Sequence, residues 1–96
     1  MNQFLEALGQ DWVDAAKRLG AAIDKPTLDS SIALELLELA RVAAHTQERR
    51  FAPLTSYLAG VAVERLRTAT PEVDDETIAK FLEEVRKKLE REVPGS

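Results

Sequence analysis

The residues of this chain best able to do chemistry stand close together near its middle. Arg41, His45 and Glu48 follow one another at spacings of four and three residues, so on a helix they share one face, with Glu38 one turn earlier. A histidine on such a face can transfer a proton or help to bind an anion near neutral pH. The same spacing is typical of a charge ladder on a solvated helix, and both interpretations stay open. A metal site is not indicated, since the sequence has no second histidine and no Glu-x-x-His motif.

A second group of polar residues lies where the next helix is expected to begin. Arg49 and Arg50 precede that helix, and Thr55 falls in its first turn. Unpaired backbone NH groups at a helix N-terminus attract anions, and guanidinium groups add bidentate contacts to phosphate or carboxylate. Arg41, His45, Arg49, Arg50 and Thr55 therefore form a candidate anion site, which requires both connector arginines to lie within about 15 Å of His45. A solvated basic connector, with Thr55 bonded to a backbone carbonyl, explains the same residues.

No pattern in the sequence indicates catalysis. It contains no Gly-rich phosphate loop, no Gly-x-Ser-x-Gly motif and no adequate set of acid and base groups. It also contains no cysteine, which excludes disulfides and thiolate metal sites. We expect a protein that is not an enzyme and uses no cofactor.

Charge varies along the chain. The whole chain has a net charge of −4, made up of −4 over residues 1–40, +3 over 41–67 and −3 over 68–96. Such a distribution is unsuited to nucleic acids and to anionic membranes, whose binding relies on many phosphate contacts. The connector around Arg49 is also longer than a helix-turn-helix motif uses. Because no targeting segment or membrane span is visible, we expect a soluble, cytoplasmic protein.

Apolar residues recur at spacings of three and four along most of the chain. This periodicity predicts four helices, near residues 2–19, 30–47, 53–68 and 74–92. Gly20 suits a C-terminal cap, Pro53 a first helical position and Asp74 an N-terminal cap. With 96 residues, the chain has room for one modest core. We predict an all-α, compact, four-helix bundle-like single domain over residues 1–93, followed by a frayed tail at 94–96.

The second predicted helix has the widest apolar surface and should be the most buried. Its apolar positions span about 160° when Leu34 and Val42 are left out, and this span includes Leu37. The charge of Glu35 marks the remaining arc as solvated. The third helix is predicted to face inward through Leu54, Leu58, Val61, Ala62 and Leu66.

The predicted helices carry more apolar surface than a small core can cover. On the third helix, Leu58, Ala59 and Val63 lie outside the narrowest inner stripe, and Gly60 with its small neighbours keeps the surface thin. Apolar patches beyond a few hundred Å² usually mark an interface, most often a twofold one. The sequence therefore predicts a homodimer.

Two runs of the sequence resemble a small, all-helical bacterial family of unknown function. They are Leu36–His45, which contains the pattern Leu-x-x-Ala-Arg-x-x-Ala-His, and Ala52–Gly60, which begins Ala-Pro-Leu-Thr; the similarity extends over Trp12 to Ala62. The connector reads Arg-Arg-Phe where members often have Arg-Pro-Ala. Members occur alone or fused to nucleotidyltransferases resembling molybdenum-cofactor guanylyltransferase, so the resemblance implies an accessory role and no established activity. The chain has no βαβ pattern, and the transferase would be a separate partner.

Two hypotheses of function follow. The first is a non-enzymatic helical interaction module that forms a homodimer and assists a nucleotidyltransferase of the molybdenum-cofactor type. The alternative is a small anion or nucleotide binder that uses the basic connector between the second and third helices.

Overall fold

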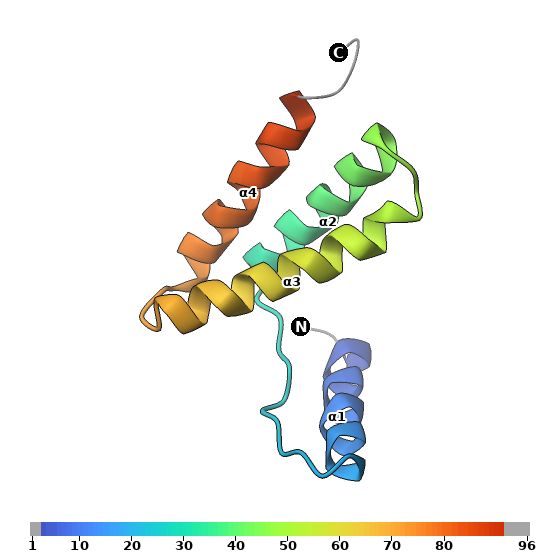
Figure 1. Cartoon of the computed structure of the whole chain (residues 1–96), viewed down its shortest axis with the longest axis vertical. Helices are drawn as coiled ribbons and strands as arrows, with labels where there is room; N and C mark the ends of the chain where they lie inside the picture. The colour runs from blue at the N-terminus through green and yellow to red at the C-terminus, as the bar shows by residue number, and fades with distance from the viewer. Residues whose placement is uncertain (1–2, 92–96) are drawn as a thin grey trace. The chain divides into compact units, whose positions relative to one another are not determined.

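The computed structural model describes residues 3–91, in which every regular element is a helix (Figure 1). The helices are α1 (Gln3–Arg18), α2 (Ser30–Thr46), α3 (Phe51–Ala69) and α4 (Asp75–Arg91). The predicted all-α class and the four predicted helices are confirmed, each end lying within two residues of its expected position. The predicted tail at 94–96 lies outside the described residues, and the domain bounds of 1–93 stay a prediction.

The chain divides between Ser30 and Ser31 into two compact units. The N-terminal unit consists of α1 and the segment that follows it. Gly20 has a φ of 81°, and the NH groups of Gly20 and Ala21 donate to the carbonyls of Lys17 and Ala16, both at 2.9 Å. This pairing is a Schellman motif, in which a left-handed glycine ends the helix and turns the chain back. The predicted cap at Gly20 is confirmed.

The returning segment lies against α1 at Gly9. A Cβ added at Gly9 would stand 2.8 Å from the carbonyl oxygen of Pro26, so only glycine admits this approach without a shift. Beside it, Lys25 Nζ lies 3.0 Å from Glu6 Oε2. The hydrogen bond and positive charge of Lys25 lower the pKa of the Glu6 carboxyl. The segment after α1 is thus held against the helix by contacts between residues that are well separated in the sequence.

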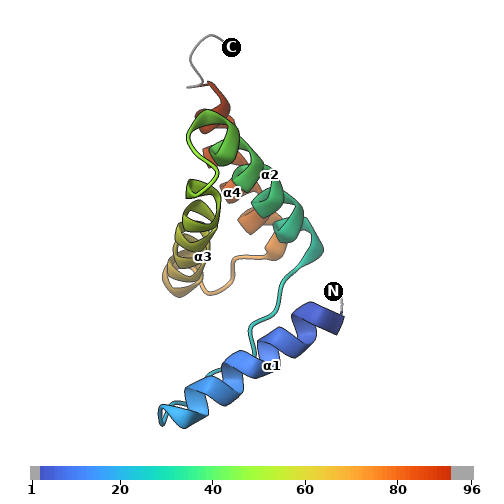
Figure 2. The ribbon, with the colours of Figure 1, turned by 90° about the vertical axis from the view of Figure 1, so that its right-hand side faces the viewer.

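The C-terminal unit is a bundle of α2, α3 and α4, in which α3 runs back against the direction of the other two (Figures 1 and 2). Nine hydrophobic residues form its core: Ile32, Ala33, Leu39, Val42, Ala43, Ala59, Val63, Ile78 and Leu82. Helix α2 supplies five of the nine, which confirms that it is the most buried helix of the described chain. Ile78 is the one large side chain there with no exposed surface.

The buried face of α2 is rotated from the predicted one. Val42 is 3% exposed although the prediction left it out, whereas Leu37, which the prediction included, is 68% exposed. The prediction was wrong because the charge of Glu35 led us to expect this side of the helix in solvent. In the structure Glu35 Oε2 accepts a hydrogen bond from Arg86 Nε at 2.9 Å, so a paired carboxylate shares the side that faces α4.

The predicted inner face of α3 is also wrong. Leu54 and Leu58 are 58% and 66% exposed, while Ala59 and Val63 are core residues. Helix α3 has apolar residues on two sides, and the side with smaller residues is the one that packs inward. Small side chains allow two helix backbones to approach closely. The larger leucines are left on the outside.

The ends of α3 and α4 differ in how well the sequence predicted them. Helix α3 begins at Phe51 rather than Pro53, because the Phe51 NH already donates to the Glu48 carbonyl in the turn before it. The proline therefore lies inside the first turn, where its missing NH costs no hydrogen bond. Helix α4 begins after Asp74, whose Oδ1 accepts a hydrogen bond from the backbone NH of Thr77 at 2.8 Å. This bond confirms the predicted cap and lowers the pKa of Asp74.

No helix within residues 3–91 has both the length and the apolar character needed to cross a bilayer.

Candidate functional site

The predicted chemical face of α2 is largely a charge ladder. Arg41 Nη2 lies 2.9 Å from Glu38 Oε2, one turn away, and both side chains are about half exposed. His45 is exposed in the last turn of the same helix. A pair of this kind on a helix surface contributes little to stability and leaves the guanidinium accessible to water.

The start of α3 uses several of the backbone donors expected of an anion site. The NH groups of Phe51 and Ala52 donate to the carbonyls of Glu48 and Arg49 at 2.9 and 3.1 Å, and Pro53 has no NH. The expectation of unpaired NH groups is therefore wrong at these three positions. Side chains would supply most of the contacts to an anion there.

Of those side chains, Arg50 is already engaged. Its guanidinium pairs with the carboxylate of Glu48, and its Cζ lies 5.3 Å from the centre of the Phe51 ring. Arg49 is exposed beside it. The fifth candidate, Thr55, lines a groove between α3 and α4. The gathering of all five residues around one anion stays a prediction.

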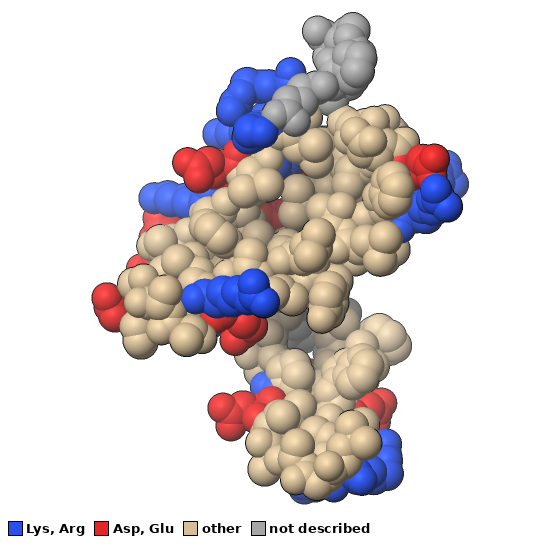
Figure 3. Space-filling view, viewed as in Figure 1, with Lys and Arg blue, Asp and Glu red and all other residues tan. Residues whose placement is uncertain are grey.

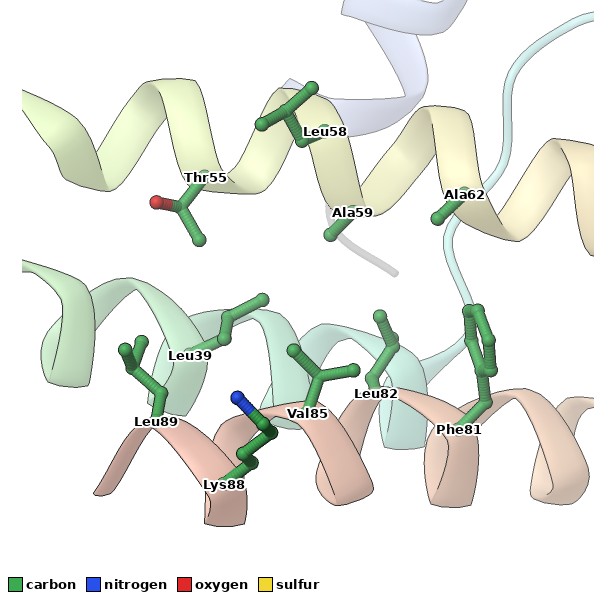
Figure 4. A pocket seen from close by; sticks show the side chains of 10 residues that line it. All are labelled: Leu39, Thr55, Leu58, Ala59, Ala62, Phe81, Leu82, Val85, Lys88 and Leu89. Carbon is green, nitrogen blue, oxygen red and sulfur yellow. The ribbon is translucent and has the colours of Figure 1, made fainter. Parts of the chain in front are cut away.

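That groove is an apolar hollow on the surface of the described bundle. It has a volume of about 360 Å³ and lies between α3 and α4, with α2 beneath (Figure 4). Its lining residues are Leu39, Thr55, Leu58, Ala59, Ala62, Phe81, Leu82, Val85, Lys88 and Leu89. Only Thr55 and Lys88 bring polar groups, a hydroxyl and an ammonium. The surface is suited to apolar side chains and offers no acid–base pair.

Sequence reasoning missed this groove because it assigned both of its walls to the core. Leu58 and Ala62 were placed on the inner face of α3, and the helical spacing of Phe81 and Val85 likewise predicts an inward stripe on α4. Val85 is in fact 52% exposed. Two apolar stripes on consecutive antiparallel helices are the available signal, but periodicity alone does not tell whether the stripes meet or remain apart.

A second apolar surface lies on the outside of α3. We call it the outer face of α3 and define it by Leu54, Tyr57, Leu58, Gly60 and Val61. Its three large residues are 58%, 71% and 66% exposed, in chain order. A Cβ at Gly60 would have no neighbour within 4 Å, so a shallow hollow opens beside the tyrosine. Charged side chains lie at the N-terminal end of α3 and also over its C-terminal half, where Glu64 and Arg65 border the hollow, while uncharged residues cover much of the rest (Figure 3).

Within residues 3–91, no group of three or more His, Cys, Asp or Glu side chains is placed to hold a metal ion.

Comparison with known proteins gives one match. A family model described as "Domain of unknown function (DUF6457)" matches residues 5–94. No curated protein and no solved structure matches the chain.

Proposed function

The chain belongs to the family of domains of unknown function DUF6457, and from that premise we propose that it is a non-enzymatic helical interaction module of the cytoplasm. The observation that carries this proposal is the groove between α3 and α4. These two helices form its sides and α2 forms its floor. Grooves of this kind receive the apolar face of another helix, which inserts side chains at helical spacing.

The groove favours a partner helix of defined chemistry. Its apolar lining suits anchors such as leucine or phenylalanine at helical spacing on the incoming helix. The family resemblance of the sequence suggests a nucleotidyltransferase of the molybdenum-cofactor type as the protein that carries this helix. In this role the chain would assist an enzyme without performing its chemistry.

Calorimetric titration with the purified nucleotidyltransferase of the same host tests this role. Val85→Asp places a charge in the groove and should weaken binding by at least about tenfold. Lys87→Asp introduces an aspartate on the opposite side of α4 instead and should leave the affinity for the nucleotidyltransferase nearly unchanged. Absence of binding by the wild-type chain, or equal loss in both variants, would contradict the proposal.

We also propose that the module is a homodimer. Leu54, Tyr57 and Leu58 remain more than half exposed on one helix, which supports an interface there. The sequence-based prediction of a homodimer relied on Leu58, Ala59 and Val63. Ala59 and Val63 are buried within the bundle, so only Leu58 of these three residues is available for an interface. Light scattering should give twice 10.6 kDa at micromolar concentration, and a mass of 10.6 kDa at every concentration would exclude the dimer.

The anion or nucleotide binder stays the second candidate, supported by the exposed arginine pair of the connector. A thermal-shift panel of phosphates and nucleotides separates the two candidates, because a ligand that binds the folded chain must raise its melting temperature. The expected rise disappears in an Arg49→Ala, Arg50→Ala variant. A flat panel excludes this candidate and leaves the interaction module untouched.

A further inference from the structure

The centre of α3 and its two ends differ in chemistry. Gly60 is the middle residue of the helix, with nine residues of Phe51–Ala69 on either side. Most exposed apolar residues of the outer face of α3 lie on its N-terminal side, Glu64 and Arg65 border it on the C-terminal side, and the surface over Gly60 itself is open. A second α3 laid antiparallel with its own Gly60 at this point would bring the start of each helix near the end of the other.

The two ends of α3 carry opposite charge. Before the helix, Arg49 and Arg50 are exposed against a single carboxylate, Glu48. After it, the turn into α4 and the first residues of that helix contain four exposed acids and no base: Glu72, Asp74, Asp75 and Glu76. Two of these acids have basic partners nearby, Asp75 with Arg67 at 3.7 Å and Glu76 with Lys80 at 3.4 Å, so the end stays acidic after pairing. The dipole of α3 adds positive partial charge at the arginine end.

We propose that the occupant of the outer face of α3 is the same face of a second copy, antiparallel and related by a twofold axis near Gly60. The proposal rests on the homodimer proposed above and specifies its geometry. The twofold axis places the arginine end of each helix beside the acidic end of the other, so the favourable charge contact occurs twice. A parallel pairing would instead bring like ends together.

The small residue at the axis fits the same arrangement. Gly60 allows the two helices to approach closely there, and Tyr57, one turn earlier, faces the turn that follows Gly60 on the other copy. A 19-residue helix is about 28 Å long. Contact along most of that length comes nearest to the roughly 800 Å² per partner that a standard interface buries, which a crossing at one point does not.

A charge exchange between two variants tests this geometry. The first variant is Arg49→Glu with Arg50→Glu, which makes both ends of α3 acidic. The second is Glu72→Lys with Glu76→Lys, which together with the neighbouring Arg67 and Lys80 makes the acidic end basic as well and keeps Asp74 as the cap of α4. In the proposed dimer, each variant repels its own copy, whereas one copy of each restores both charge contacts.

Sedimentation at low ionic strength gives the readout, with circular dichroism to establish that both variants are folded. Each variant alone should dimerise at least about tenfold more weakly than the wild-type chain, and an equimolar mixture should regain dimers. Gly60→Leu should also prevent dimerisation, since the open surface over Gly60 leaves the monomer fold room for the larger side chain. A wild-type dimer that tolerates every one of these changes overturns the antiparallel α3 geometry while the homodimer stands. A wild-type chain that stays monomeric overturns both.

Discussion

Two glycines lie in the interiors of helices, Gly9 in α1 and Gly60 in α3, and their surroundings give them opposite roles. Gly9 faces the Pro26 carbonyl so closely that a Cβ would stand 2.8 Å from its oxygen, while the space over Gly60 is open to 4 Å. In a helix interior, alanine is more favourable than glycine by about 1 kcal/mol when nothing else changes. The contact at Gly9 opposes that gain, and the open space at Gly60 leaves it intact.

Substituting each glycine by alanine therefore separates the two roles. Gly60→Ala should raise the free energy of unfolding by about 1 kcal/mol, measured with urea at a concentration low enough to keep the chain monomeric. Gly9→Ala forces the returning segment away, and overpacking of this kind costs about 1–3 kcal/mol. Backbone amides of residues 21–29 should then exchange with deuterium faster than in the wild-type chain. Unchanged exchange in Gly9→Ala would show that the segment does not depend on this contact.

The cap of α4 should make part of the stability depend on pH. The hydrogen bond from Thr77 holds the pKa of Asp74 below its ordinary value of 3.8. The unfolded chain therefore binds a proton more readily, so the cap contributes fully above that ordinary value and its contribution is lost as pH falls through the lowered pKa. Asp74→Ala should reduce the urea midpoint at pH 7, and the difference from wild type should shrink in acid.

Asp74→Asn is the matched control for this prediction. Asparagine caps helices as well as aspartate does but does not titrate, so this variant should keep most of the stability and lose the pH dependence. A difference between wild type and Asp74→Ala that stays constant down to the lowest pH would contradict the assignment.

At the scale of elements, a polar tie joins α2 to α4. Arg86 donates to Glu35 and, within its own helix, to Glu90, at 2.9 and 2.8 Å. The Arg86 and Glu35 side chains are 16% and 18% exposed, and these hydrogen bonds raise the pKa of the guanidinium. Glu35 lies on the same side of α2 as Val42, two turns away, so the tie marks which side of α2 faces α4.

Removing the guanidinium should weaken the bundle. Arg86→Ala leaves the half-buried Glu35 carboxylate without this donor, and we expect a loss of about 2 kcal/mol in the free energy of unfolding. Lys87→Ala removes a neighbouring exposed pair with Glu83, at 3.0 Å, and should change stability little. Chemical denaturation of the two variants side by side measures the contrast. Equal effects would show that the tie between helices adds nothing beyond a surface pair.

The positions of the helices could be predicted from the sequence, but which faces they bury could not. Local signals mark the ends: a left-handed glycine at 20 and a capping carboxylate at 74 act within a few residues. The buried side depends on partners distant in the chain. Glu35 was assigned to solvent because its partner, Arg86, lies 51 residues away and no local pattern reveals that the two pair. Leu54 and Leu58 were assigned to the core because periodicity does not reveal that α3 packs through its smaller residues.

At the scale of the whole molecule, the predicted anion site shows the same limit. The residue types around the connector are correct for binding an anion, yet the backbone donors expected there are used within the turn that starts α3. Thr55 belongs to the groove, which no local pattern announces. Side-chain chemistry can thus be read from sequence, whereas a surface assembled from three helices becomes visible only in the fold.

The small core of the bundle has a calorimetric consequence. Several of its nine members are alanine or valine, so unfolding exposes little apolar surface and the heat-capacity change per residue should fall at or below the usual 12–15 cal/mol/K. For a domain of this size, about 1 kcal/mol of added stability moves the melting temperature by roughly 4–8 °C. A second copy bound to the folded chain therefore shifts the melting curve by an amount that ordinary scanning calorimetry resolves. Diluting the sample is enough to reveal whether the bundle melts alone.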